Sequence, residues 1–135
     1  MKLRYLENPE LKVKEVAALR KAVGWDSRED KIEKILGCTY LTAVCYDGKL
    51  LVGFVDVLSD EVDDALIRSL IVHPDYQRKG IGLRLLKMVT HRVKTDKIKT
   101  VNVLFEPELA HFYERAGFRI VGGGLIDNEN EAEGF

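Results

Sequence analysis

Residues 70–84 combine residue types that suit the binding of a phosphate-bearing ligand. They read LIVHPDYQRKGIGLR, an apolar strand-like run, a His-Pro-Asp break and a helical segment opened by Gly80 and Gly82. The first amides of a helix have no partners within it, and with the helix dipole they favour an anion. Glycines also let a phosphate approach the backbone closely. Three basic side chains lie in the same stretch, Arg78, Lys79 and Arg84. The stretch therefore predicts a pyrophosphate-binding site, and we call residues 77–83 the phosphate loop.

The Gln-x-x-Gly-x-Gly spacing alone also fits an ordinary strand-to-helix turn that needs flexible glycines. A second motif, LAHFYERAGF at residues 109–118, follows in the chain, with a strand-like run between the two motifs. With both motifs in this order, the sequence resembles the GNAT superfamily of acyl-CoA-dependent N-acyltransferases. LIVHPDYQRKGIG is similar to the segment that binds the acyl-CoA pyrophosphate in that family, and FYERAGF to its helix-then-strand signature. The resemblance covers about residues 41–118 in order and spacing.

The resemblance implies acetyl-CoA as the cofactor, with coenzyme A as the product. Main-chain amides of residues 78–83 would hold the pyrophosphate, and residues 70–72 would hold the pantetheine arm. A backbone N–H of residues 70–72 would also stabilise the negative charge that develops on the thioester oxygen during attack. The full cofactor-binding set is Leu70, Ile71, Val72, Gln77, Arg78, Lys79, Gly80, Ile81, Gly82 and Leu83.

Tyr113 and Glu106 are the candidate catalytic residues. Tyr113 matches the tyrosine that protonates the departing thiolate in the family, although an aromatic residue on an apolar helix face is normally part of a core. Many members have Asn seven residues before this tyrosine, where this chain has Glu106, and the glutamate base of some members corresponds to Val101. Neither role transfers directly. Glu106 is either the base for the amine or a solvated residue at a helix start, where negative charge is favourable.

Other side chains are weaker candidates for the base. A His-Pro turn is usually structural, which applies to His73, and His111 is expected on the side of its helix opposite Tyr113. The side-chain directions of strand residues depend on the register of the sheet. These further candidates are Asp56, Asp64 and Ser69.

Composition indicates one ordinary soluble domain over residues 1–135. The chain is 46% hydrophobic and 32% charged, and its net charge is −1. It has no apolar run near the ~20 residues that span a membrane, and no signal-peptide core, so a cytoplasmic location is expected. The two cysteines lack metal-ligand spacing, so no metal is expected.

The basic residues are concentrated in one part of the sequence. Residues 78–99 contain eight Lys or Arg and only one acidic residue. Such a basic region suits the binding of a polyanionic cofactor, or it is simply a solvated surface. The basic residues lack interleaved aromatics, which argues against nucleic-acid binding.

The spacing of apolar residues predicts the elements. A strand is expected at residues 2–6. A first helix is expected to begin at Pro9 and end at Gly24, and a second to be capped by Asp26 or Ser27 and to end at Gly37. Strands follow at residues 39–46 and 49–58 around an Asp-Gly turn, and at residues 65–72. A helix from Ile81 leads to a strand at residues 98–105, expected parallel to its predecessor. The last elements are a helix at residues 107–116, a strand at 118–121 and an edge strand within 125–135.

These elements predict an α/β (α+β) fold, with a mixed, mostly antiparallel sheet of about six or seven strands and about four flanking helices. The resemblance implies an N-acetyltransferase that moves an acetyl group from acetyl-CoA to a primary amine of a small molecule by direct attack. The alternatives are acetylation of a protein N-terminus or lysine, and a non-catalytic acyl-CoA-binding regulatory domain. In GNAT proteins the first two helices often border the acceptor site. No membrane partner is expected, and a C-terminal edge strand would let two copies pair as a homodimer.

Overall fold

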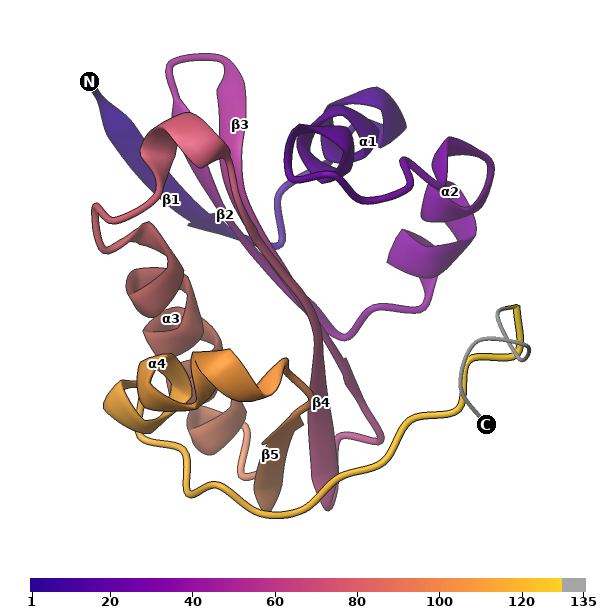
Figure 1. Ribbon diagram of the computed structural model, residues 1–135, viewed down its shortest axis with the longest axis vertical. Coiled ribbons are helices and arrows are strands. Elements are labelled where there is room, and N and C mark those ends of the chain that lie inside the picture. The colour runs from indigo at the N-terminus through magenta and orange to yellow at the C-terminus, as the bar shows by residue number, and fades with distance from the viewer. Residues whose placement is uncertain (130–135) are drawn as a thin grey trace. The chain divides into compact units, whose positions relative to one another are not determined.

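The computed structural model describes residues 1–129. Residues 1–103 form one compact unit, and a second unit begins at Leu104. The first unit contains a sheet in the order β1-β2-β3-β4-β5 (Figure 1). Its strands are β1 (Leu3–Glu7), β2 (Leu41–Asp47), β3 (Leu50–Ser59), β4 (Asp64–Val72) and β5 (Thr100–Val103). The first four are antiparallel to their neighbours, and β5 lies parallel to β4, which confirms the predicted parallel pair.

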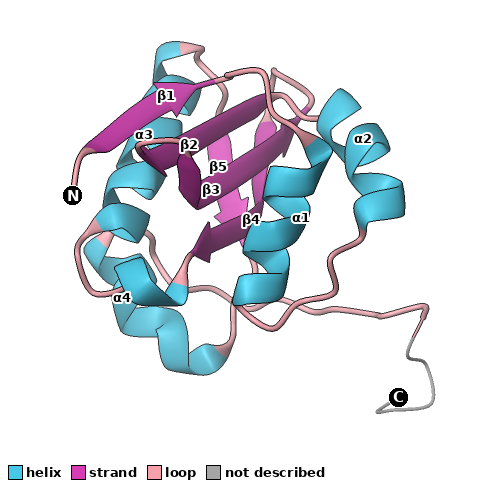
Figure 2. Ribbon diagram, turned by 90° about the horizontal axis from the view of Figure 1, so that it is seen from above, coloured by secondary structure: helices cyan, strands magenta, loops and turns pink. Residues whose placement is uncertain are grey.

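Helices cover both faces of this sheet (Figure 2). The first unit contains α1 (Val13–Ala22), α2 (Glu29–Gly37) and α3 (Ile81–Thr95), and the second contains α4 (Ala110–Arg115). Two short 3₁₀ turns lie at Pro74–Tyr76 and Pro107–Leu109. The mixed, mostly antiparallel sheet and the four helices are as predicted. One domain over residues 1–135 stays a prediction.

Apolar side chains fix which helix covers which face. On the face that we call the α1/α2 face, Val16 and Leu19 of α1 and Ile32 of α2 pack in one buried cluster with Val44, Phe54 and Ile71 of the strands. On the opposite face, α3 buries a stripe at helical spacing. This stripe consists of Ile81, Leu85, Leu86, Val89 and Val93. The sheet therefore lies between two separate hydrophobic cores, one on each of its faces.

Within residues 1–129 the sheet has five strands, so the prediction of six or seven was too high. Residues 118–121 form no strand, and Ile120 and Val121 are 41% and 70% exposed. A β-branched sequence is extended readily, but it becomes a strand only when a neighbour pairs with its backbone groups. Of the predicted last strand at 125–135, residues 125–129 are irregular and residues 130–135 lie outside the described part.

Both N-terminal helices begin later than predicted. The first begins at Val13 and not at Pro9, because Glu15 Oε2 accepts a hydrogen bond of 2.8 Å from the Lys12 amide and so closes the first turn there. The second has Arg28 at its N-cap, in place of Asp26 or Ser27. Arg28 has φ +51°, in the left-handed region, and its amide donates to Asp26 Oδ1 at 3.1 Å.

Gly53 of β3 provides a test of the packing between α3 and the sheet. A Cβ there would lie 2.9 Å from Ile81 Cγ2 and 3.0 Å from Leu85 Cδ1, both fully buried side chains. We expect Gly53→Ala to lower the free energy of unfolding by ~1–3 kcal/mol, because overpacking displaces neighbours. Gly37→Ala is the control, since a Cβ at Gly37 meets nothing within 4 Å. Denaturant unfolding measures both, and equal stability of the two variants would contradict the packing described.

Candidate functional site

The N-terminus of α3 offers free backbone donors. Gly80, its N-cap, has φ +83°, and no side chain caps the helix. The first backbone bond at this end joins the Arg84 amide to the Gly80 carbonyl at 3.1 Å, so the amides of residues 81–83 precede it. The first turn carries no acidic residue, and a Cβ at Gly80 would meet nothing within 4 Å. The end of this 15-residue helix is therefore positive, open and free of side chains at its N-cap.

Side-chain hydrogen bonds shape the turn that leads into the phosphate loop. Gln77 Nε2 donates to the Val72 carbonyl at 2.9 Å and so joins the loop to the end of β4. His73 Nδ1 accepts from the Asp75 amide at 3.1 Å, which is the structural role expected of a His-Pro turn. The Tyr76 hydroxyl donates to the Asp47 carboxylate of the β2–β3 hairpin. The side chain of Gln77 thus braces the loop, while its predicted contact with a cofactor stays a prediction.

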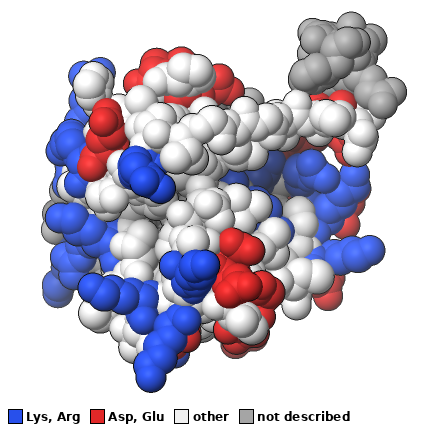
Figure 3. Space-filling view, turned by 90° about the horizontal axis from the view of Figure 1, so that it is seen from below, with Lys and Arg blue, Asp and Glu red and all other residues white. Residues whose placement is uncertain are grey.

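The basic residues near the loop are of two kinds. Arg78 and Lys79 are exposed, and Arg78 has φ +64°. The guanidinium of Arg84 instead lies over the ring of Tyr5, 4.1 Å from its centre, so a cation–π contact holds it against β1. Further basic side chains gather along the side of the molecule that carries α3 (Figure 3). Arg78 and Lys79 can therefore move toward an anionic ligand, whereas Arg84 is held against β1.

The segment predicted to hold the pantetheine arm lies at an open edge of β4. Leu70, Ile71 and Val72 pair with residues 53–55 of β3. On the other side, pairing with β5 ends at Ile67 and Val103 (Figure 1). Within the described residues no strand pairs with residues 70–72 on that side. Their outward backbone groups can therefore accept an extended ligand in the way that an added strand pairs with a sheet edge.

Tyr113 lies among aromatic residues of the second unit. Its ring stacks on Phe105 at 4.6 Å and meets Phe112 and Phe118 edge-on at 5.1 and 5.7 Å. The side chain is 5% exposed, and burial raises the pKa of its phenol. Among the described residues its hydroxyl has no hydrogen-bond partner, and the oxygen is not among the fully buried unpaired atoms, so it keeps some accessible surface. The phenol is therefore protonated at neutral pH and free to donate.

The other candidates for a base differ in exposure. Glu106 is exposed and precedes the 3₁₀ turn, and its side chain does not cap that turn. His111 is 98% exposed and lies 3.4 Å from Glu114, as expected for a residue facing away from Tyr113. Asp64 is exposed and accepts a hydrogen bond from Thr100 at the β4–β5 contact. The positions of these side chains do not show which of them acts as a base. The catalytic role of Glu106 stays a prediction.

Asp56 is buried on the α1/α2 face, which the sequence alone did not indicate. Its side chain is 1% exposed and accepts hydrogen bonds from Arg68 of β4, one of them from Nε at 2.8 Å. Burial raises the pKa of the Asp56 carboxyl, and Arg68 and Ser69 partly oppose this. Although Ser69 lies close, Asp56 Oδ1 has no hydrogen-bond partner. The alternation of β3 and its register with β4 would have revealed this pair, but an irregularity at Asp56 and Val57 hides it in the sequence.

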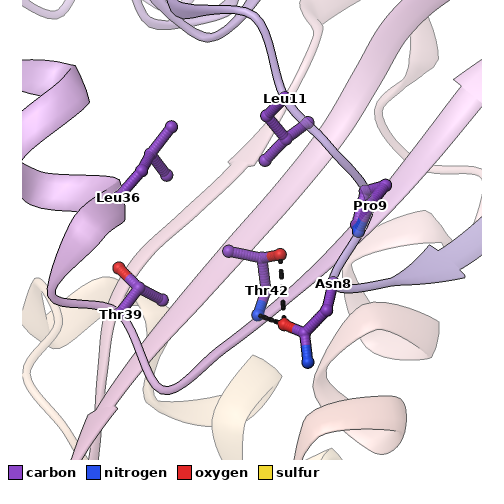
Figure 4. Close-up of a pocket in the computed structure, with 6 residues that line it drawn as sticks. All are labelled: Asn8, Pro9, Leu11, Leu36, Thr39 and Thr42. Carbon is purple, nitrogen blue, oxygen red and sulfur yellow. Dashed lines mark hydrogen bonds between the residues drawn. The ribbon is translucent and has the colours of Figure 1, made fainter.

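A pocket of about 200 Å³ lies on the same face of the sheet (Figure 4). It lies where the β1–α1 connection, the end of α2 and the start of β2 meet. Thr39 links it to the ion pair, because Arg68 Nη2 donates to Thr39 Oγ1 at 2.9 Å. Asn8 Oδ1 accepts from the Thr42 amide at 2.8 Å and closes the pocket on one side. The lining residues are Asn8, Pro9, Leu11, Leu36, Thr39 and Thr42.

The family model described as an acetyltransferase (GNAT) domain matches residues 8–131. The chain belongs to the GNAT acetyltransferase family. This confirms the resemblance on which the site was predicted. The match spans the phosphate loop and Tyr113, so both lie within the GNAT domain.

Individual GNAT proteins support this assignment. The chain is 30% identical over 102 residues to an uncharacterized N-acetyltransferase, ycf52, of Gracilaria tenuistipitata var. liui, covering 72% of this chain and 56% of that protein. It thus spans little more than half of that relative. The structure of a GNAT family acetyltransferase, SP0256, from Streptococcus pneumoniae is 27% identical with a TM-score of 0.81, over 94% of this chain and 99% of that one. An aminoglycoside 6'-N-acetyltransferase solved with coenzyme A shares the fold, at 17% identity and a TM-score of 0.73, over 90% and 87% of the two chains.

Membrane-spanning helices are absent from residues 1–129: no helix there combines the length and the apolar character that crossing a bilayer requires. The predicted cytoplasmic location stays a prediction.

The phosphate loop can be tested with two glycines of similar backbone conformation. Gly80 has φ +83° and Gly24 φ +86°, and a Cβ at either meets nothing within 4 Å. We expect Gly80→Glu to abolish acetyl-CoA binding in calorimetric titration, because a carboxylate at the head of α3 blocks and repels a pyrophosphate. Gly24→Glu has a similar backbone strain and should bind like the wild type. Retained binding in Gly80→Glu would remove the phosphate loop from the site.

Proposed function

We propose that this GNAT domain transfers an acetyl group from acetyl-CoA to a primary amine of a small molecule. The observation that carries the proposal is the open N-terminus of α3, with the Gly80 backbone in the left-handed region and no capping side chain. A pyrophosphate is the kind of group that such a helix end favours. In this proposal the amides of the phosphate loop hold the pyrophosphate and residues 70–72 pair with the pantetheine arm.

Bound acetyl-CoA would supply the thioester. The amine nitrogen attacks its carbonyl carbon, so a C–N bond forms, the C–S bond breaks, and the thiolate leaves. A backbone N–H of residues 70–72 stabilises the charge on the carbonyl oxygen. Tyr113 donates its phenolic proton to the thiolate, and Glu106 accepts the proton that the amine loses. Coenzyme A and an acetamide are the products, and no covalent intermediate on the protein is needed, because binding both substrates together supplies much of the acceleration.

Two other functions compete with this one. The first is acetylation of a protein, at its N-terminus or at a lysine. The pocket of about 200 Å³ on the α1/α2 face favours a small molecule over a protein as the acceptor. The second is a non-catalytic acyl-CoA-binding domain. A free hydroxyl at Tyr113 favours catalysis, because no group within the described residues occupies this proton donor and it can donate to a ligand.

Three assays separate these functions. We expect micromolar binding of acetyl-CoA in calorimetry and thiol release that depends on an added small amine. Release only with peptides would replace the small acceptor by a protein. Binding without release from any amine or peptide would support the regulatory domain, and no binding by a folded protein would refute the proposal.

Tyr113→Phe tests the general acid. We expect kcat to fall by ~10²–10⁴-fold, with cofactor affinity unchanged, because only the proton donor is lost. Phe112→Leu, which alters a ring against Tyr113 but leaves the hydroxyl, is the control for packing. Full activity of Tyr113→Phe would assign the proton donor elsewhere.

The pH dependence of kcat should also report on Tyr113 as the general acid. A general acid works while protonated, and burial raises the pKa of Tyr113 above its ordinary value. The loss of activity at high pH is therefore shifted upward, and we expect no alkaline decline in kcat below about pH 10. A decline well below that pH, absent from a substrate-ionisation control, would point to a different acid.

A further inference from the structure

Three arginines gather on the α1/α2 face. Arg20 lies in the last turn of α1, Arg28 is the N-cap of α2, and Arg68 lies on β4 against Asp56. The pKa of Arg20 is lowered first by burial and then by the positive charge of Arg28, with Arg68 acting in the same direction. Asp26 and Asp56 oppose this shift. Each of the other four charged groups therefore acts electrostatically on Arg20, and Arg20 and Arg28 belong to the two helices, α1 and α2, that cover one side of the sheet (Figure 2).

The charges of this cluster do not balance. Asp56 is occupied by Arg68, and Asp26 Oδ1 is occupied by the backbone amide of Arg28. Within residues 1–129, neither Arg20 nor Arg28 forms an ion pair. Both guanidiniums are only partly buried and have no ion-pair partner within the described residues, so the three arginines and two aspartates of the cluster keep a net charge of +1.

Arg20 and Arg28 are nevertheless held in place. Arg20 Nε donates to the Asp26 carbonyl at 2.7 Å, and its guanidinium lies 5.2 Å from the centre of the Trp25 ring. Within residues 1–129, its other N–H groups form no hydrogen bond. Arg28 Nε is buried and has no hydrogen-bond partner in the described structure. A buried, unpaired donor on a cation is costly unless a ligand or another group completes it.

Local preferences do not explain Arg28. An N-cap favours Ser, Thr, Asp or Asn, and a positive side chain at this end opposes the helix dipole. The residue also has φ +51°, which is unfavourable for a residue other than glycine, asparagine or aspartate. A residue that breaks three local rules at once is expected at a functional position.

The cluster adjoins the predicted reaction site. Arg68 precedes Leu70 by two residues, roughly 7 Å along an extended strand. It also bonds Thr39, which lines the pocket on this face. An acceptor in this pocket would thus lie beside the Thr39–Arg68 contact, on the strand that continues into residues 70–72.

We propose that the acceptor amine carries an anionic group, a carboxylate or a phosphate, which Arg28 and Arg20 bind. This inference rests on the proposed function, since it names the class of acceptor for that site. The anion supplies acceptors for the unpaired guanidinium N–H groups and compensates their charge. It thereby places the amine of the same molecule toward the thioester, while Arg68 stays paired with Asp56.

Matched amines test this proposal. Propylamine and γ-aminobutyrate differ by one carboxylate, and ethanolamine and phosphoethanolamine by one phosphate, so the two pairs distinguish the sources of the anion. In the wild type we expect the anionic member of at least one pair to have a higher kcat/KM by ~10–100-fold, mainly through KM, as charged hydrogen bonds would give. Arg28→Gln should remove this preference, and Arg20→Gln should weaken it. Lys34→Gln, an exposed cation of the same helix, is the matched control and should keep it.

Acetyl-CoA titration of every variant separates failure of this inference from failure of the proposed function. Equal or better turnover of the neutral amines, with normal cofactor binding, overturns the anionic acceptor but leaves the acetyltransferase standing. An unchanged preference in both arginine variants also overturns it. Cofactor binding with no turnover of any of the four amines refutes the anionic acceptor together with the small-molecule acceptor. Loss of cofactor binding by the wild type refutes the proposed function itself.

Discussion

The unequal pairing of β4 is the constraint on which the predicted cofactor site of this domain depends. On one side β4 pairs with β3 up to Val72, whereas on the other it pairs with β5 only as far as Ile67. The first pairing holds residues 70–72 in the sheet, and the second leaves their other side without a paired strand within the described residues. Because β4 then leads through the phosphate loop into α3, a rigid open edge and a positive helix end follow each other along one stretch of chain.

The two faces of the sheet differ in the kinds of side chain that pack against them. On the α3 face, Gly53 lets Ile81 and Leu85 approach the strand so closely that a Cβ would not fit, which fixes the start of α3 and with it the phosphate loop. On the α1/α2 face the buried apolar cluster is interrupted by an ion pair, two further arginines and a pocket. Charged groups in a core lower the free energy of unfolding, because the attraction within a buried ion pair rarely offsets the cost of desolvating its two charges. Such a loss of stability is typical of a ligand-binding site.

What the sequence predicted well depends on local chemistry. The Asp-Gly hairpin, the glycine-led start of α3 and the parallel β4–β5 pair follow from neighbouring residues and from the handedness of strand connections. The Asp56–Arg68 pair could not be predicted, because the register shift beside Asp56 decides which residues face each other. Residues 118–121 have the composition of a strand but no strand partner within the described part of the chain, and pairing is a property of the whole fold.

The start of α2 shows why departures from local rules are informative. A capping residue such as Asp or Ser was available at positions 26 and 27, yet the helix begins one residue later with Arg28 in a left-handed conformation. The Asp26 carboxylate holds that conformation through the Arg28 amide, and the Asp26 carbonyl holds Arg20. One residue thus positions two cations whose repulsion alone would separate them. Such an arrangement costs folding free energy, and an anion bound between the guanidiniums would offset both their repulsion and the unpaired Nε.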